Sequence, residues 1–253
     1  FAPVLQQQFP AIENIVRTAD DIGAGVLTYN ETATENKVFS EANIKYVDGN
    51  FLSVFSFPII SGNASLQQPK TLALSENMSR KLFGTTAATG KTITVSNQFG
   101  NTLYTVQAVY RLPEESDITA EVLLSLQTLE SPANRDGNDW ADPNGTDNGL
   151  TRFYLQLRKD ANSVVLANSI TQFVRSVNPG SKTDIVYLQP FSEMHLAPSF
   201  DYPYQTFGNL LLVVVFLCVA ILILVIAWVN YINLSTAQAL NRAKEVGVRK
   251  VLG

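Results

Sequence analysis

Cysteine and histidine are almost missing from this chain of 253 residues, with one of each. The single cysteine, Cys218, lies inside an apolar run, so no disulfide can form within the chain. The single histidine, His195, has no second histidine and no cysteine outside that run, which argues against a zinc site and against Cys/His catalysis. A packed or surface histidine is the expected role. No glycine-rich phosphate loop is present either, so we expect no ATP site in this chain.

Charge is missing from forty consecutive residues, Tyr202 to Asn241. Within them Leu210 to Val229 is wholly apolar, and as a helix it would be about 30 Å long, the thickness of a bilayer's hydrocarbon core. Aromatic residues flank it, as at membrane interfaces. The outer ones are Tyr202, Tyr204 and Phe207, and the inner ones are Trp228 and Tyr231. The sequence therefore predicts one transmembrane helix over residues 207–233.

Orientation follows from the positive-inside rule. Four basic residues follow the span closely, whereas the nearest charge before it is Asp201. The C-terminal end is therefore expected in the cytoplasm, and residues 1 to about 205 in the periplasm of a bacterium, with the span in the inner membrane. A signal peptide is excluded as the role of the apolar run, which lies at the wrong end of the chain. Since Phe1 is not a start methionine, we expect an earlier span or a cleaved signal to export this domain.

Composition fits a folded exported domain on a membrane stem. Hydrophobic residues make up 46% and charged residues 16% of the chain, and the apolar excess is concentrated in the span. The remaining residues, about 200, suffice for one or two hydrophobic cores. A net charge of −4 and a pI near 5.1 argue against nucleic acid as a partner, since that needs clustered lysine and arginine.

The exported part has the mixed patterns of an α+β domain. Period-2 alternation predicts strands, and apolar residues every three or four positions predict helices. Ser75 and Gly84 mark the start and stop of one helix. The expected elements are a helix ending near Phe9, strands Ile12–Arg17, Gly25–Tyr29 and Lys37–Lys45, a short helix capped by Asp48, a strand Phe57–Ile60, the helix after Ser75, a hairpin of Thr92–Ser96 and Thr102–Arg111, a strand Thr151–Arg158, a helix with its apolar stripe from Leu166 to Val177, and a strand Thr183–Leu188.

Acidic residues gather in two places without forming a recognisable site. Residues 131–149 hold many turn formers and are expected to form an exposed loop. The acids of this loop do not fit a calcium-binding EF-hand, because Ala141 stands where that motif needs glycine. The second group has nothing nearby that would shift its pKa values for catalysis. The loop acids are Asp136, Asp139, Asp142 and Asp147, and the second group is Glu114, Glu115 and Asp117.

The end of the chain carries a specific motif. Residues 229–253, VNYINLSTAQALNRAKEVGVRKVLG, closely resemble the second transmembrane helix and following cytoplasmic segment of MacB/FtsX-like ABC transporter permeases. The pattern there is approximately R-x-x-E-[IV]-G-[IV]-R-[KR]-x-x-G. The matching residues are Arg242, Glu245, Val246, Gly247, Val248, Arg249, Lys250 and Gly253.

The exported part is similar to the MacB-type periplasmic core domain. The similarity is carried by residues 47–62, 74–84 and 90–93, and residues 188–196 resemble the segment that returns that domain to the membrane. It covers nearly the whole chain, and residues 113–149 match only loosely.

This resemblance implies a permease subunit that is not itself an enzyme. It implies a porter-like α/β part over 1–60 and 113–200, an inserted smaller β-rich lobe over 61–112, and a cytoplasmic coupling segment over 234–253. The implied partners are a cytoplasmic ABC ATPase that binds ATP and Mg²⁺, a second permease chain as a homodimer or permease pair, and in some members a periplasmic adaptor and outer-membrane channel. In such permeases ATP hydrolysis drives movement of the periplasmic domains, a mode called mechanotransmission. Efflux, lipoprotein release and hydrolase activation all use this coupling.

The coupling segment also has a physical interpretation of its own. On a helix, Glu245 can pair with Arg249 and with Arg242, and Leu240, Ala243, Gly247 and Val251 lie on one side. The residues predicted to couple to the ATPase are Arg242, Lys244, Glu245, Val246, Gly247, Val248, Arg249 and Lys250. One alternative is a stop-transfer anchor whose basic residues hold anionic headgroups. The other is an extracytoplasmic sensor that passes a ligand signal through one helix to a kinase or chemotaxis module.

Overall fold

The structure is a computed structural model, in which two units are described separately, Phe1–Leu188 and Gln189–Gly253. The residues that it describes are 2–20, 22–30, 36–113, 116, 118–145, 149–178, 180, 182–194, 196 and 208–253.

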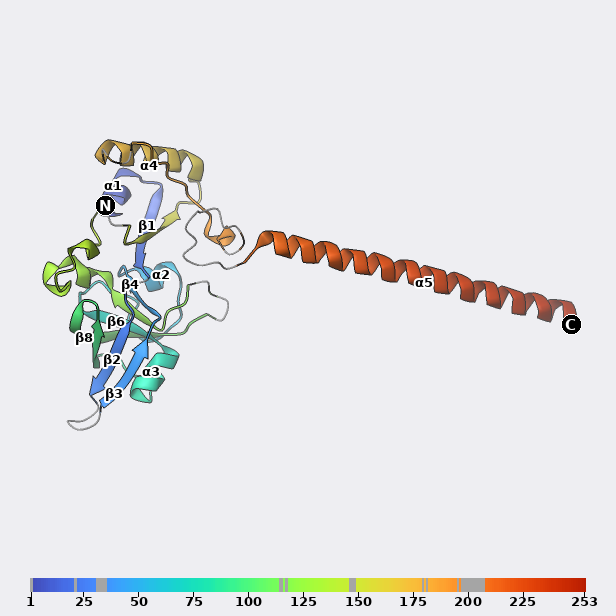
Figure 1. The fold of residues 1–253 in the computed structure, drawn as a ribbon, viewed down its shortest axis with the longest axis horizontal. Helices are drawn as coiled ribbons and strands as arrows, with labels where there is room; N and C mark the ends of the chain where they lie inside the picture. The colour runs from blue at the N-terminus through green and yellow to red at the C-terminus, as the bar shows by residue number, and fades with distance from the viewer. Residues whose placement is uncertain are drawn as a thin grey trace. The chain divides into compact units, whose positions relative to one another are not determined.

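The first unit is a mixed α/β domain, which confirms the predicted fold class (Figure 1). Its helices are α1 (Ala2–Gln8), α2 (Phe51–Val54), α3 (Glu76–Phe83) and α4 (Ser163–Val177). Its strands are β1 (Ile12–Ala19), β2 (Gly25–Asn30), β3 (Asn36–Glu41), β4 (Ile44–Val47), β5 (Ile59–Gly62), β6 (Thr71–Ser75), β7 (Thr92–Asn97), β8 (Gly100–Tyr110), β9 (Val122–Ser125) and β10 (Arg152–Leu157). Short 3₁₀ helices are η1 (Leu126–Glu130), η2 (Pro132–Asn134) and η3 (Asp139–Ala141).

All ten strands belong to one sheet. Its order is β10-β1-β4-β9-β6-β8-β7-β2-β3, and β5 also pairs with β8. The pairs β4–β9 and β6–β8 are parallel, and the other pairs are antiparallel. The 11-residue strand β8 connects the two halves of the sheet, since its first part pairs with β7 and its second part with β6 and β5.

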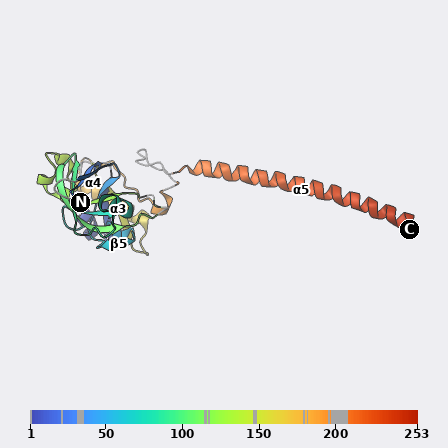
Figure 2. The ribbon, with the colours of Figure 1, turned by 90° about the horizontal axis from the view of Figure 1, so that it is seen from below.

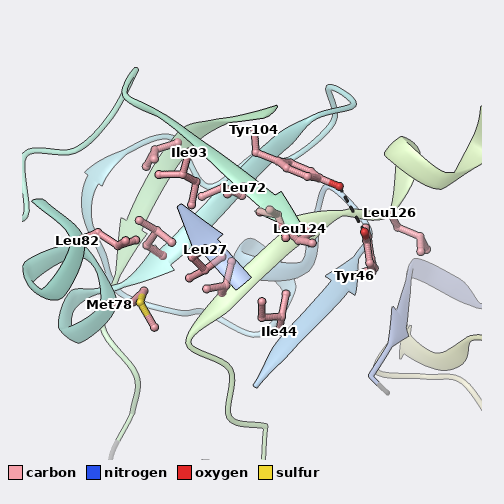
Figure 3. Close-up of a cluster of buried hydrophobic side chains, with 14 of the residues drawn as sticks. Leu27, Ile44, Tyr46, Leu72, Met78, Leu82, Ile93, Tyr104, Leu124 and Leu126 are labelled. Atoms are coloured by element: carbon pink, nitrogen blue, oxygen red, sulfur yellow. Dashed lines mark hydrogen bonds between the residues drawn. The ribbon is translucent and has the colours of Figure 1, made fainter. Parts of the chain in front are cut away.

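The main core lies between α3 and the sheet. Figure 3 shows part of this cluster, with Met78 and Leu82 on α3 and Leu27, Leu72 and Leu124 on strands. These five side chains are at most 1% exposed. The hydroxyl groups of Tyr46 and Tyr104 lie 3.4 Å apart within the cluster. Burial of such side chains contributes roughly 1.5–3 kcal/mol each to folding, so this cluster is a main source of the domain's stability.

Helix α3 begins and ends as the sequence predicted. The Ser75 side chain accepts a hydrogen bond from the backbone N–H of Met78, at 2.9 Å. Gly84 ends the helix in the left-handed conformation, with φ of 69°, which glycine adopts without steric cost. The hairpin β7–β8, the N-terminal helix, the strands β1, β2 and β10, and helix α4 are also confirmed.

Four local predictions are wrong. The expected strand Lys37–Lys45 is two strands, because the chain turns after Glu41, whose carboxylate accepts a hydrogen bond from the backbone N–H of Asn43. The expected strand Phe57–Ile60 is shifted, since β5 runs from Ile59 to Gly62. Helix α2 is preceded by Asn50 rather than capped by Asp48, which instead binds an arginine. Residues 184–188 form no strand.

Residues 131–145, the main described part of the segment 131–149, are more ordered than the composition of that segment suggests. It holds η2 and η3, and Arg135, Ala141 and Pro143 are buried. Arg17 donates a hydrogen bond to the carbonyl oxygen of Pro143, and Ala141 belongs to the main core, so contacts with residues distant in sequence fix the segment onto the domain. Composition alone cannot reveal such contacts.

Several predicted features lie outside the described residues. These are His195, the acids Glu114, Glu115, Asp117 and Asp147, and the outer aromatic residues Tyr202, Tyr204 and Phe207. The proposed division into 1–60 with 113–200 and a lobe over 61–112 crosses the single sheet. Strand β2, from the first range, pairs with β7, from the lobe.

The second unit contains α5 (Leu210–Leu252), a helix of 43 residues that Figures 1 and 2 show without interruption. The unit also holds a 3₁₀ helix, η5 (Phe191–Glu193). Asn209 caps α5, since its side chain accepts hydrogen bonds from the backbone N–H groups of Leu211 and Leu212. Among the described residues, α5 alone is long and apolar enough to cross a membrane.

The core assignment predicts how stability responds to truncation. Leu124→Ala, at a side chain that is 0% exposed, should lower the free energy of unfolding by about 2–5 kcal/mol, because it removes buried methyl groups and leaves a cavity. The control Val164→Ala, at a side chain 68% exposed on α4, should change it by less than about 0.5 kcal/mol. Urea unfolding of the full chain in detergent, followed by near-UV circular dichroism, measures both. Equal effects of the two changes would contradict the assignment.

Candidate functional site

The predicted coupling residues all lie in the last turns of α5, and all are exposed. They are Arg242, Lys244, Glu245, Val246, Gly247, Val248, Arg249 and Lys250. One of the two expected ion pairs is present, between Glu245 and Arg249 at 3.2 Å. The expected pair of Arg242 with Glu245 is not formed among residues 208–253, because the carboxylate of Glu245 binds Arg249 in the favoured i,i+4 order.

The coupling segment has two different sides. At 100° per residue, Arg242, Glu245 and Arg249 share one side of α5. Leu240, Ala243 and Gly247 lie roughly opposite them. A Cβ atom added at Gly247 would meet nothing within 4 Å. The helix itself therefore does not require glycine there, and the small side remains open to a partner.

Helix α5 is longer than a bilayer needs. Its 43 residues correspond to about 65 Å at 1.5 Å per residue, and its apolar run to about 30 Å. The remaining half, from Asn230 to Leu252, continues from the apolar run to the coupling segment as the same helix. An apolar segment and a charged segment are thus connected without a hinge.

A second candidate site is the cluster that joins both ends of the domain. We call it the end cluster: its buried members come from α1, β1 and α4, and Val186 and Leu188 pack against it. The buried members are Ala2, Leu5, Ile12, Ile15, Leu166 and Ile170. Segments about 180 residues apart in sequence therefore share one core.

Specific contacts fix the last segment of the domain to α4. The backbone N–H of Val186 donates to the Thr171 hydroxyl at 3.0 Å. Arg175 donates from Nε to the carbonyl oxygen of Asp184 at 2.9 Å. These bonds use backbone groups that a strand would give to a neighbour, which explains why residues 184–188 form none.

Strand β1 carries a buried arginine, Arg17, with several charged and polar partners. Arg17, 5% exposed, binds Asp48 through Nη2–Oδ1 at 2.9 Å and Nε–Oδ2 at 3.0 Å. It also donates to the carbonyl oxygen of Pro143 at 3.0 Å and to Oδ1 of Asn144 at 3.1 Å. Burial disfavours the charged guanidinium, but these carboxylate interactions outweigh it and raise the pKa of Arg17 above its ordinary value.

A second buried arginine, Arg135, lies in the segment that follows β9 and binds other residues of that segment. Arg135 donates from Nε to the carbonyl oxygen of Leu129 at 2.6 Å and from Nη2 to that of Glu130 at 3.0 Å. It also pairs with Asp142 at 3.0 Å. The sequence reasoning missed both arginines, since nothing around Arg17 or Arg135 marks them as buried. Both guanidinium groups bind carboxylate and carbonyl oxygens of the domain itself, so we interpret the two arginines as structural.

In the described part of the chain, no three His, Cys, Asp or Glu side chains gather where they could hold a metal ion. An open pocket of about 350 Å³ lies at the start of α3. There Glu76 binds Arg80 at 3.0 Å and Arg111 at 3.2 Å. Hydrogen bonds from these two arginines lower the pKa of Glu76.

The Arg17–Asp48 pair gives a stability prediction. Asp48→Asn should lower the free energy of unfolding by about 3–5 kcal/mol, because it leaves a buried guanidinium without its counter-charge. Removing both charges, as Arg17→Met with Asp48→Leu, should cost less than the single change. The control is the exposed pair Arg158–Asp160, at 3.5 Å, where Asp160→Asn should cost less than about 1 kcal/mol. Urea unfolding measures these three variants against the unsubstituted protein, and a double variant that loses at least as much stability as Asp48→Asn would contradict a coupled buried pair.

Comparison with known proteins places the domain in a family. Residues 2–197 match the profile described as the MacB-like periplasmic core domain. Among solved structures, a domain of a protein described as a permease from Porphyromonas gingivalis is similar with a TM-score of 0.55 and 20% identity, over 76% of this chain and 86% of that one. No curated protein sequence matches the chain.

Two further solved structures are similar. One is the periplasmic region of MacB from Actinobacillus actinomycetemcomitans, with 18% identity, TM-score 0.48, and coverage of 70% of this chain and 72% of that one. The other is the extracellular domain of the ABC-type transporter YknZ from Gram-positive bacteria, with 13% identity, TM-score 0.48, and coverage of 75% and 87%. Both scores lie below 0.5, so the assignment rests on the family profile, with the Porphyromonas structure supporting the fold. Because the profile covers residues 2–197 of 253, the chain belongs to the MacB-like periplasmic core domain family of MacB/FtsX-type ABC transporter permeases.

Proposed function

We propose that this chain couples ATP hydrolysis in the cytoplasm to movement of its periplasmic domain, in efflux or envelope export. Helix α5 crosses the inner membrane, and residues 234–253 contact a cytoplasmic ABC ATPase subunit. That subunit, rather than this chain, binds ATP and Mg²⁺. The observation that carries the proposal is the unbroken helix from Leu210 to Leu252, which joins the apolar run to the coupling segment.

Rigidity supports transmission along α5. The helix contains no proline and a single glycine, Gly247, near its end. Sharp helix kinks arise mainly at proline, at glycine or serine pairs, or where the hydrogen-bond ladder is interrupted. A displacement at the cytoplasmic end should therefore reach the outer end of the span as movement of the whole helix.

The charges of the coupling segment support a contact outside the helix. The Glu245–Arg249 pair has side chains 63% and 80% exposed, and such pairs stabilise a helix by only about 0.2–0.5 kcal/mol. Helix stability alone is a weak reason for this dense pattern of charges. A partner surface of complementary charge, next to the small side at Gly247, explains both features.

The end cluster supports the proposed transmission of movement through the periplasmic domain. It contains residues of α1, at the start of the domain, and it contacts Val186 and Leu188, at the end of the domain. A force applied at either end of the domain would therefore act on the same cluster of side chains. Two of its members, Ile12 and Ile15, belong to β1, which pairs with β4 and β10. The load is thus delivered to the sheet through strand hydrogen bonds.

The proposed assembly is a pair of permease chains with the ATPase, as a homodimer or a permease pair. Residues 1 to about 205 lie in the periplasm, where an adaptor and outer-membrane channel can extend the system. The division into a porter-like part, 1–60 with 113–200, and a lobe, 61–112, belongs to this proposal. A division would let the parts of the one sheet change their relative twist.

Charge reversal tests the proposal. Glu245→Lys combined with Arg249→Glu keeps an oppositely charged pair on the helix but reverses the charges offered to a partner. It should leave ATP hydrolysis by the reconstituted complex largely intact while export falls by about tenfold, the effect of roughly 1.4 kcal/mol of lost coupling. Transport and ATP turnover are measured together in proteoliposomes.

The matched control is Arg158→Glu, an exposed charge on the periplasmic domain, 55% exposed, which should change neither rate. Normal transport by the Glu245/Arg249 double variant would show that the charges serve only the helix, and would overturn the proposal.

A further inference from the structure

A pocket lies where the end of strand β8 meets the start of helix α3. Strands β6 and β8 are parallel, and Ser75 at the end of one is paired with Tyr110 at the end of the other. The chain therefore leaves the sheet at the same edge after each of these strands. The two departing segments line an open pocket of about 350 Å³, which we call the α3 pocket. Its lining residues are Ser75, Glu76, Asn77, Arg80, Arg111 and Leu112.

Positive charge exceeds negative charge among these lining residues, of which only Glu76, Arg80 and Arg111 are charged. The Glu76 carboxylate is shared between the two arginines. Arg80 donates from Nη2 to its Oε1 at 3.0 Å, and Arg111 donates from Nε to its Oε2 at 3.2 Å. These hydrogen bonds lower the pKa of Glu76, which is therefore ionised at neutral pH. One carboxylate thus faces two guanidinium groups, and one positive charge is left over.

A second carboxylate lies close by but is used elsewhere. Glu121 accepts a hydrogen bond from the Ser75 hydroxyl and does not line the pocket. The same hydroxyl accepts a hydrogen bond from the backbone N–H of Met78, as the N-cap of α3. In the described part of the chain, Arg80 and Arg111 form ion pairs with Glu76 alone.

The two arginines of the pocket leave most of their donors unused by the described protein. A guanidinium group has five N–H donors. The buried Arg17 donates from Nε, Nη1 and Nη2 to oxygens of the domain. Arg80 and Arg111, 60% and 63% exposed, each donate from one nitrogen only among the described residues. Their other donors can therefore form the bidentate hydrogen bonds by which arginine binds anionic oxygens.

Stability does not account for this arrangement. Exposed ion pairs contribute little to the free energy of unfolding. Helix α3 is already held by Met78 and Leu82 in the main core and by its cap at Ser75. Two arginines on one carboxylate are therefore not needed to fix the helix, whereas recognition of a further anion would use both.

Size, charge and lining select the ligand. The volume of about 350 Å³ is at the lower end of the range for ligand pockets, and it is larger than a bare ion needs. One surplus positive charge suits a carboxylate, since a phosphate monoester carries about −1.5 to −2 at pH 7. Leu112, half-buried in the wall, offers an apolar contact. We propose that the α3 pocket binds a small organic carboxylate, whose charged group pairs with Arg80 and Arg111 and whose apolar part contacts Leu112.

Binding of butyrate to the full chain in detergent tests the site, with saturation-transfer NMR as the readout and protein-free micelles as the background. Butyrate has a carboxylate and a short apolar chain, butyramide has the same shape without the charge, and inorganic phosphate is an anion without the chain. We expect butyrate to bind about tenfold more tightly than either, because it alone offers both an anionic oxygen pair and an apolar part. Absence of butyrate binding, or equal binding of butyramide or phosphate, would overturn the proposal.

Substitutions in the pocket should change butyrate binding in opposite directions. Arg80→Gln and Arg111→Gln should each weaken it about tenfold, since each removes a charged donor. Glu76→Gln should strengthen it about threefold, since the carboxylate that competes for the arginines loses its charge. The controls Arg158→Gln and Asp160→Asn, in an exposed ion pair elsewhere on the domain, should leave it unchanged.

The expected gain from Glu76→Gln separates recognition from folding, because a misfolded variant can only lose binding. Unchanged binding in either arginine variant, or no gain in Glu76→Gln, would refute the site. Neither result bears on the coupling proposal, since these measurements need no ATPase.

Discussion

The packing of both domain ends into one hydrophobic cluster is the constraint on which the rest of the account depends. Leu5 on α1, Ile15 on β1 and Ile170 on α4 share this cluster with Val186, which follows α4 in the chain. A domain whose ends attached at separate places would deform when one end moved. Here both ends contribute to the same packed group, so in the proposed coupling the sheet would receive displacement as a unit through β1.

The other special features of the domain limit which parts can move. Arg17, on β1, binds Asp48 and the segment that follows β9, and Arg135 binds other residues of that same segment, so this long connection is held in one arrangement against the sheet. The outer strands β3, β2 and β7 are held from one side by the main core and are open on the other.

Local sequence signals predicted the elements whose burial is periodic. The N-cap at Ser75, the stop at Gly84 and the alternation from Thr92 to Arg111 all predicted correct elements, and the resemblance of the exported part predicted the family that the profile over residues 2–197 shows. Strands β6 and β9 were not predicted, because all their residues are buried and their sequences therefore show no alternation of polar and apolar residues. Asp48 was misassigned because its partner, Arg17, lies 31 residues away.

The most direct test of the coupling claim is to identify what contacts the end of α5 in native membranes. A photo-reactive amino acid at Val248, exposed beside the charged side of the helix, would capture its neighbour on irradiation, and mass spectrometry would identify it. The account predicts an ABC ATPase subunit. Capture of a histidine kinase or chemotaxis protein, or of lipid alone, would contradict it.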